Sequence, residues 1–273
     1  MKHMWRYVVL TLLATAVVAT VAVAQEVSFK DPVGDDNGPG TYTYPTDAVY
    51  KPGSFDLVSF KMKKAGDKYQ LDFGVGATLE DKCWSMQYGF CVQMLFVFVK
   101  SDPATGHTEG LPGLNVQFAP EAGWNKVIIV SPQPANRVKD EAAAKVAKGL
   151  LGDVIVPIRV KGTGRTISAW IDAKDLPQGD IAAWGYQVIV QSNEGFPAAT
   201  DLLTRKVNEY EGQHRFGGGN DGDCDPHAID ILAGDSVGDK SEIEAQHTML
   251  AYECNADGTS KKMATLTMVH MKK

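Results

Sequence analysis

Several common signatures are missing from this 273-residue sequence, and each absence argues against a class of protein. Basic residues number 27 against 33 acidic ones and form no cluster, which argues against a nucleic-acid partner because phosphate binding depends on grouped Lys and Arg. No His-Glu-x-x-His or P-loop motif occurs, and no Gly-x-Gly-x-x-Gly motif follows a predicted strand. The lack of Cys-x-x-Cys argues against a redox motif or zinc ribbon, and the lack of Cys-x-x-Cys-His excludes covalently attached haem. We therefore expect a protein that is not an enzyme.

The first 24 residues have the pattern of a secretory signal peptide. Lys2 and Arg6 precede an apolar stretch over residues 7–23, and Ala-Val-Ala at 22–24 matches a cleavage site. We expect cleavage after Ala24 and a secreted or periplasmic protein formed by residues 25–273 as a single domain. The alternative is an uncleaved membrane anchor, because the apolar run is close to the minimum of about 17 residues for a span.

The remaining sequence favours an all-β fold. The chain is 44% hydrophobic, with 27 glycines and 13 prolines between short apolar runs, which is typical of strands joined by turns. One helix is predicted, from about Val138 to Leu150, as an insertion between strands. The run at 89–100 is apolar on both faces and predicts a central strand, whereas Pro157 places its own strand at an edge or bulge. Nine strands are predicted, over residues 55–62, 68–75, 89–100, 114–118, 125–131, 154–160, 165–172, 184–191 and 263–270. Such a series indicates an antiparallel β-sandwich.

The four cysteines lie in the part of the chain that follows the signal peptide. An even number of cysteines in an oxidising compartment indicates two disulfides. We predict Cys83–Cys91 and Cys224–Cys254, because each pair lies within one turn-rich stretch and closes a short loop. The alternative is one bridge and two buried free thiols.

Two polar loops rich in Gly and Asp, over residues 31–40 and 217–225, are candidate calcium sites. In the first loop, Asp31, Asp35, Asp36 and Asn37 offer the oxygen ligands that calcium prefers, although aspartates in turns also accept hydrogen bonds from the backbone without any metal. The second loop ends at Asp225, which would complete the site if the two loops meet.

The second loop also begins like an EF-hand, with Asp at 221, 223 and 225. The EF-hand is rejected because Pro226 stands where the motif has glycine and Leu232 stands where it has a bidentate glutamate.

Aromatic residues in turn-rich stretches are candidates for ligand binding. Sugar-binding modules stack pyranose rings on exposed aromatic side chains, and Trp84, Tyr88 and Trp124 are the best placed to form such a platform. The alternative is that these rings are buried in the core, as tryptophan often is in sandwiches.

Several motifs resemble those of one known family, the DOMON-like C-terminal module of glucodextranases, which also occurs on amylases and pullulanases. The most specific motif is DPVGDDNGPGTYTYP over residues 31–45, followed by GSFDL at 53–57. Further matches occur in order along the chain, namely GF at 89–90, LPGLNV at 111–116, GW at 123–124, GRTI at 164–167, WGYQV at 184–188, SNEGF at 192–196, FGGG at 216–219, DP at 225–226 and ID at 229–230.

The resemblance implies an immunoglobulin-like β-sandwich that lacks catalytic residues. It implies that the module binds a polysaccharide or a glycan of the cell envelope. The wider DOMON superfamily binds either sugars or haem, so a haem b electron-transfer protein is the alternative function. The eligible axial ligands are Met62, Met86, Met94, Met268, His214 and His227.

Overall fold

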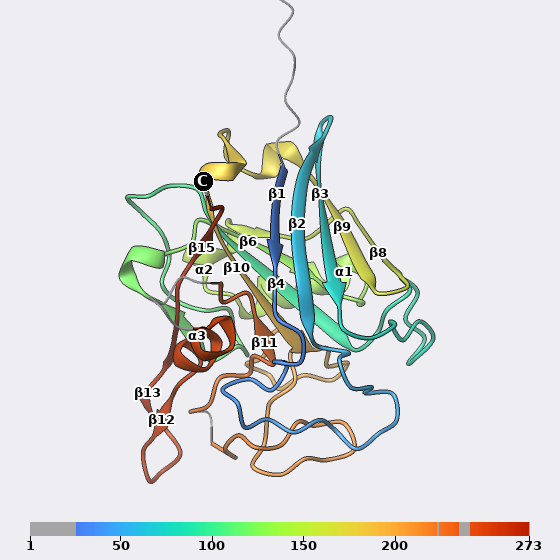
Figure 1. Ribbon diagram of the computed structural model, residues 1–273, viewed down its shortest axis with the longest axis vertical. Helices are drawn as coiled ribbons and strands as arrows, with labels where there is room; N and C mark the ends of the chain where they lie inside the picture. The colour runs from blue at the N-terminus through green and yellow to red at the C-terminus, as the bar shows by residue number, and fades with distance from the viewer. Residues whose placement is uncertain (1–25, 223, 235–240, 273) are drawn as a thin grey trace, which may run out of the picture.

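The computed structural model describes residues 26–272, except for residue 223 and residues 235–240. The predicted signal peptide and the first residue after it lie outside the described residues. Two larger sheets form most of the molecule (Figure 1). The five-stranded sheet has the order β1 (Glu26–Lys30), β2 (Leu57–Ala65), β3 (Lys68–Val75), β9 (Thr166–Asp172) and β8 (Arg159–Thr163). The other sheet has the order β11 (Asp230–Ile231), β10 (Gly185–Ser192), β4 (Gln93–Lys100), β6 (Lys126–Val130) and β7 (Val154–Ile155), with β15 (Val269–His270) also paired to β10.

The two sheets pack face to face, and each contributes apolar side chains to the core between them. In β3 every second residue is buried, so one face of the five-stranded sheet lies on the core and the other meets solvent. In β4 both faces are buried. Leu95, Val97 and Val99 join the core between the two sheets, while Met94, Phe96 and Phe98 face a second core on the far side. The expected sandwich with a central strand covered on both sides is therefore confirmed.

The second core is closed by short elements laid over the six-stranded sheet. These elements are α1 (Ala135–Lys145), α2 (Lys148–Leu151), α3 (Glu242–Met249), and the parallel pair β5 (Val116–Phe118) and β14 (Ala264–Leu266). The remaining elements are the hairpin β12 (Glu253–Cys254) and β13 (Ser260–Lys262), and the 3₁₀ helices η1 (Pro120–Ala122), η2 (Ala173–Asp175) and η3 (Ile181–Ala183). No helix of the described chain is long and apolar enough to cross a membrane.

The inserted helix exists, but its bounds differ from the predicted 138–150. It begins at Ala135, directly after Pro134, and ends at Lys145 because Val146 has extended backbone angles. A separate turn of helix then forms α2. Sequence analysis missed α3, although Ser241 and Glu244 form a capping box at its start, a signal that the sequence does contain.

The single strand predicted over 154–160 is wrong, because the chain crosses between the two sheets there. Its first part, β7, pairs with β6, and its last part, β8, pairs with β9 in the other sheet. Pro157 lies at the crossing, where the lack of a backbone N–H costs no hydrogen bond of a sheet.

Both predicted disulfides are present, and the described cysteines include no free thiol. Cys83–Cys91 closes the turn before β4, and its two Cα atoms are 6.0 Å apart. Cys224–Cys254 joins the second Gly-Asp loop to the β12–β13 hairpin, with a Cα separation of 5.4 Å. The alternative of one bridge and two free thiols is therefore wrong.

The two Gly-Asp loops meet at one end of the sandwich, where Figure 1 shows the blue segment after β1 beside the orange segment after β10. The backbones of Thr43 and Gly217 exchange two hydrogen bonds of 3.0 Å, and the Thr41 hydroxyl donates to the Gly218 carbonyl at 2.9 Å. This end of the molecule thus combines segments that are far apart in sequence.

Candidate functional site

A hollow of about 750 Å³ opens near the Cys83–Cys91 turn. Four segments line it: the disulfide turn, the start of α1, the residues after β10, and the loop that runs from Arg205 to Arg215. Its side chains include two exposed aromatic rings, three arginines and several uncharged hydrogen-bonding groups. They belong to residues that include Trp84, Phe196, Arg137, Arg205, Arg215 and His214.

Trp84 presents an indole ring at this hollow, with 43% of the residue exposed. Its backbone lies in the left-handed region (φ 50°), and the Cys83–Cys91 bridge begins at the preceding residue. The ring contacts His214 edge-on with centroids 5.8 Å apart and lies 6.1 Å from the ring of Tyr50. These contacts hold the indole in place, while Phe196, at 95% exposure, supplies a second ring.

A hydrogen-bonded frame fixes the polar wall of the hollow. The Arg205 guanidinium pairs with Glu194 at 3.3 Å and donates to the Asn193 carbonyl at 3.2 Å. Arg137 donates to the Gln133 side chain at 3.1 Å and also to the Gly195 carbonyl. A network of this kind orders the donors before any ligand arrives, which reduces the entropy cost of binding.

The hollow carries an excess of positive charge. Of its three arginines, Arg205 is neutralised by Glu194, but within the described chain neither Arg137 nor Arg215 forms an ion pair. The whole chain has a formal charge of −6, so the hollow differs in sign from the molecule as a whole. Guanidinium groups recognise carboxylates through paired hydrogen bonds.

The three rings predicted to form a platform do not lie together. Trp84 is in the hollow, whereas Tyr88 is half-buried and lines an adjoining groove together with Gln133 and Arg137. Trp124 is fully buried, and its indole N–H donates to the Glu109 carbonyl at 2.8 Å. This corrects the expectation for Trp124, because no ligand can stack on a ring enclosed by the second core.

Phe196 was missed as a site residue. The signal available in the sequence is an isolated aromatic residue in the polar turn Glu194-Gly195-Phe196-Pro197, where no alternation of a strand would bury it.

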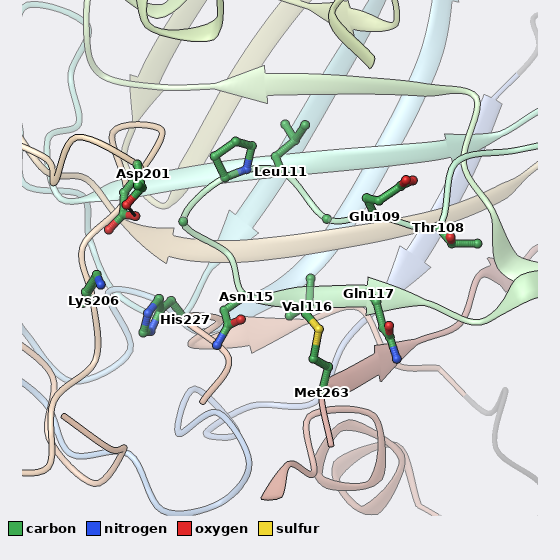
Figure 2. A pocket seen from close by; sticks show the side chains of 14 residues that line it. Thr108, Glu109, Leu111, Asn115, Val116, Gln117, Asp201, Lys206, His227 and Met263 are labelled. Carbon is green, nitrogen blue, oxygen red and sulfur yellow. Dashed lines mark hydrogen bonds between the residues drawn. The ribbon is translucent and has the colours of Figure 1, made fainter. Parts of the chain in front are cut away.

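A second hollow, of about 390 Å³, lies between the 108–117 segment, the 200–206 segment and His227 (Figure 2). Its lining includes Glu109, Gln117 and Lys206, whose side chains Figure 2 shows around the opening. His227 is 2% exposed, and its Nδ1 accepts a hydrogen bond from the Val207 N–H at 3.2 Å. Phe, Tyr and Trp are missing from its lining, so this hollow offers no flat apolar face to a sugar.

Two of the predicted metal ligands are brought together, and one further residue joins them. Ligand oxygens of Asp31, Asp35 and Asp230 all lie within 4.8 Å of one another, and all three residues are buried. Asp230 was missed because it lies in a short apolar strand far from the first loop in sequence.

The other predicted metal ligands have different surroundings. Asp36 accepts a hydrogen bond from the Tyr44 hydroxyl, and the buried side-chain oxygen of Asn37 has no hydrogen-bond partner among the described residues. Asp225 lies outside the carboxylate cluster, with its carboxylate 3.9 Å from Nδ1 of His227. The expectation that Asp225 would complete the cluster is therefore wrong, although the two loops do meet.

Burial dominates the electrostatics of the aspartate cluster. Burial, together with the negative charges of nearby Asp56 and Glu242, raises the pKa of Asp35 to about 6. Burial also raises the pKa of Asp31 and of Asp230, and each feels the negative charge of another cluster member.

A comparison with protein families identifies a family that covers almost all of the described chain. The sequence profile of the family described as the C-terminal binding-module, SLH-like, of glucodextranase matches residues 27–269. The chain belongs to this family. A comparison with curated proteins finds no significant match. Membership of the glucodextranase C-terminal module family confirms the resemblance seen in the motifs, and the family is a binding module, not a catalytic domain.

Proposed function

We propose that this protein is a secreted, non-catalytic module that binds glycans through the hollow at Trp84. The observation that carries the proposal is an exposed indole held by a disulfide turn beside ordered hydrogen-bond donors. Membership of a family of binding modules supports it. The two disulfides, which are typical of proteins that leave the cytosol, support secretion.

A pyranose ring would stack on the indole face of Trp84, and its hydroxyl groups would meet the polar wall. Aromatic stacking contributes about 0.5–1.5 kcal/mol beyond the burial of apolar area. Arg137 and Asn193 belong to the ordered wall and provide directional hydrogen bonds. Because these donors are already held by the protein, little conformational entropy is lost when a sugar binds.

The charge of the hollow favours acidic glycans. Arg137 and Arg215 have no acidic partner within the described chain, so an incoming carboxylate would gain a charge-assisted hydrogen bond without breaking an ion pair. We therefore propose uronate-containing polysaccharides or anionic polymers of the cell envelope as the ligand class.

The test is retention of the purified full-length protein in gels that contain polysaccharides, and on purified cell wall. We expect retention by acidic polysaccharides, and we expect Trp84→Ala to weaken it by at least tenfold. The matched control is Trp170→Ala, because Trp170 is half-buried on β9, stacks on Arg159 at 4.7 Å and lies outside the hollow. Equal retention of the wild type and Trp84→Ala would exclude this hollow, and no retention of the wild type on any glycan would overturn the function.

Haem b binding is the second candidate, because Met86 and His214 both line the same hollow. The other eligible ligands are less accessible: Met62, Met94 and Met268 are buried in the cores, and His227 is in the second hollow. A Soret band that appears on addition of haemin and is lost in His214→Ala would favour haem over a glycan. A colourless protein that ignores haemin would remove this candidate.

A further inference from the structure

The aspartate cluster is built from two chain segments, the loop after β1 and the start of β11, and each aspartate is held by hydrogen bonds of the surrounding structure. Asp31 follows β1, and its N–H donates to the Val58 carbonyl at 3.2 Å. The Asp35 carbonyl accepts hydrogen bonds from the Gln246 side chain, at 2.5 Å, and from the Asn37 N–H. Asp230, at the start of β11, accepts from the Leu57 N–H at 2.6 Å through one carboxylate oxygen. The carboxylates therefore meet in a rigid part of the fold.

These carboxylates are buried, and five of their six oxygens lack a hydrogen-bond donor among the described residues. Asp31, Asp35 and Asp230 are 8%, 1% and 0% exposed. Both oxygens of Asp31, both oxygens of Asp35 and the second oxygen of Asp230 accept no hydrogen bond from any described residue. Buried polar groups are almost always satisfied, and a buried charge needs an opposite charge or a metal.

No cation of the described chain compensates this negative charge. Neither Lys nor Arg pairs with the three aspartates there, and a further acid, Glu242, lies within hydrogen-bonding reach of the Asp31 carboxylate. Glu242 accepts a hydrogen bond from the Gly234 N–H at 2.5 Å, which fixes it beside the cluster. Several acids held together without a counter-charge repel one another and destabilise the folded state.

We propose that Asp31, Asp35 and Asp230 bind a calcium ion. The ligands are all oxygen, which suits a hard cation and argues against zinc. Calcium lies about 2.4 Å from its ligands, so oxygens on opposite sides of the ion are about 4.8 Å apart. The oxygens of the cluster lie within 4.8 Å of one another, which matches that span. Glu242 is the best placed further ligand, and water or carbonyl oxygens complete the coordination.

A bound calcium ion joins the end of β1, the first Gly-Asp loop and β11. This site is separate from the Trp84 hollow, since none of its residues lines that cavity. Its role is therefore to stabilise the fold, independently of the ligand that the hollow binds.

The test measures calcium binding and thermal unfolding of the full-length protein after treatment with a chelator. Titration of CaCl₂ followed by calorimetry should give saturable binding. Calcium at a hundred times its Kd should raise the melting temperature by about 5–10 °C. Asp230→Asn keeps an acceptor for the Leu57 N–H but removes one charge, so it should abolish the calcium-dependent shift.

Two further comparisons test whether the calcium-dependent shift in melting temperature comes from the charges of the aspartate cluster. With chelator present, Asp230→Asn should melt at a higher temperature than the wild type, because repulsion in the empty cluster is reduced. The control Asp225→Asn changes another fully buried aspartate outside the cluster and should retain the calcium shift. Absence of binding to the wild type, or identical melting curves with calcium and chelator, would overturn the site. An equal effect of MgCl₂ would overturn the assignment to calcium.

Discussion

Removal of the Cys83–Cys91 disulfide should weaken ligand binding, whereas removal of Cys224–Cys254 should cost more stability and leave ligand binding unchanged. The Cys83–Cys91 bridge links residues eight apart, so the loop entropy that it removes from the unfolded chain corresponds to about 2.5 kcal/mol. For Cys224–Cys254, with a separation of 30, the same relation gives about 3.6 kcal/mol. The double serine variant at 83 and 91 should thus be the more stable of the two.

The loss of glycan binding should follow the opposite order, with the larger loss in the variant at 83 and 91. Trp84 directly follows Cys83 and has a positive φ of 50°, which the free turn would not maintain. The variant at 83 and 91 should therefore lose glycan retention by about tenfold or more. The variant at 224 and 254 should keep it, because neither cysteine lines the hollow.

Two assays separate these effects. Urea unfolding gives the free energy of each variant, and retention in polysaccharide gels below the unfolding transition gives the affinity. Two results would contradict this prediction. The first is that the variant at 83 and 91 is the less stable of the two, and the second is that it binds as tightly as the wild type while the Trp84→Ala variant does not.

Three further predictions concern stability. Trp124→Ala should lower the free energy of unfolding by about 3–5 kcal/mol in urea, since the ring is fully buried, and a loss below about 1 kcal/mol would contradict its place in the core. Gly38→Ala should destabilise more than Gly34→Ala: both glycines have positive φ, but an added Cβ at Gly38 overlaps the Tyr42 ring, whereas at Gly34 it meets open space. Equal urea midpoints for these two variants would contradict that packing. In chelator, the Asp35 pKa of about 6 exceeds its ordinary value of 3.8, so the folded state binds this proton more tightly and the contribution of Asp35 to stability should increase as the pH falls from 7 towards 4. Urea unfolding at pH 7 and pH 5 should show a larger gain in the wild type than in Asp35→Asn, where the raised pKa values of Asp31 and Asp230 still contribute. A gain of the same size in both proteins would contradict the role of Asp35.

Patterns local in sequence determined much of this fold. The run at 89–100 is apolar at successive positions, and successive side chains of a strand point to opposite faces. Both faces therefore had to be covered, and β4 is buried on both faces. The disulfides were also predictable, because each closes a short loop within one turn-rich stretch. The motif over 31–45 was specific enough to indicate the family that the comparison confirms.

Contacts between distant segments decided the sites. Trp84 and Trp124 both lie in turn-rich stretches, yet one borders a hollow and the other is enclosed by the second core. Asp230, and not Asp225, meets Asp31 because the pairing of β11 with β10 fixes where its carboxylate lies, about 200 residues along the chain from its neighbours. Burial and the meeting of charges depend on how sheets and loops pack, and a local pattern of residues carries no information about that packing.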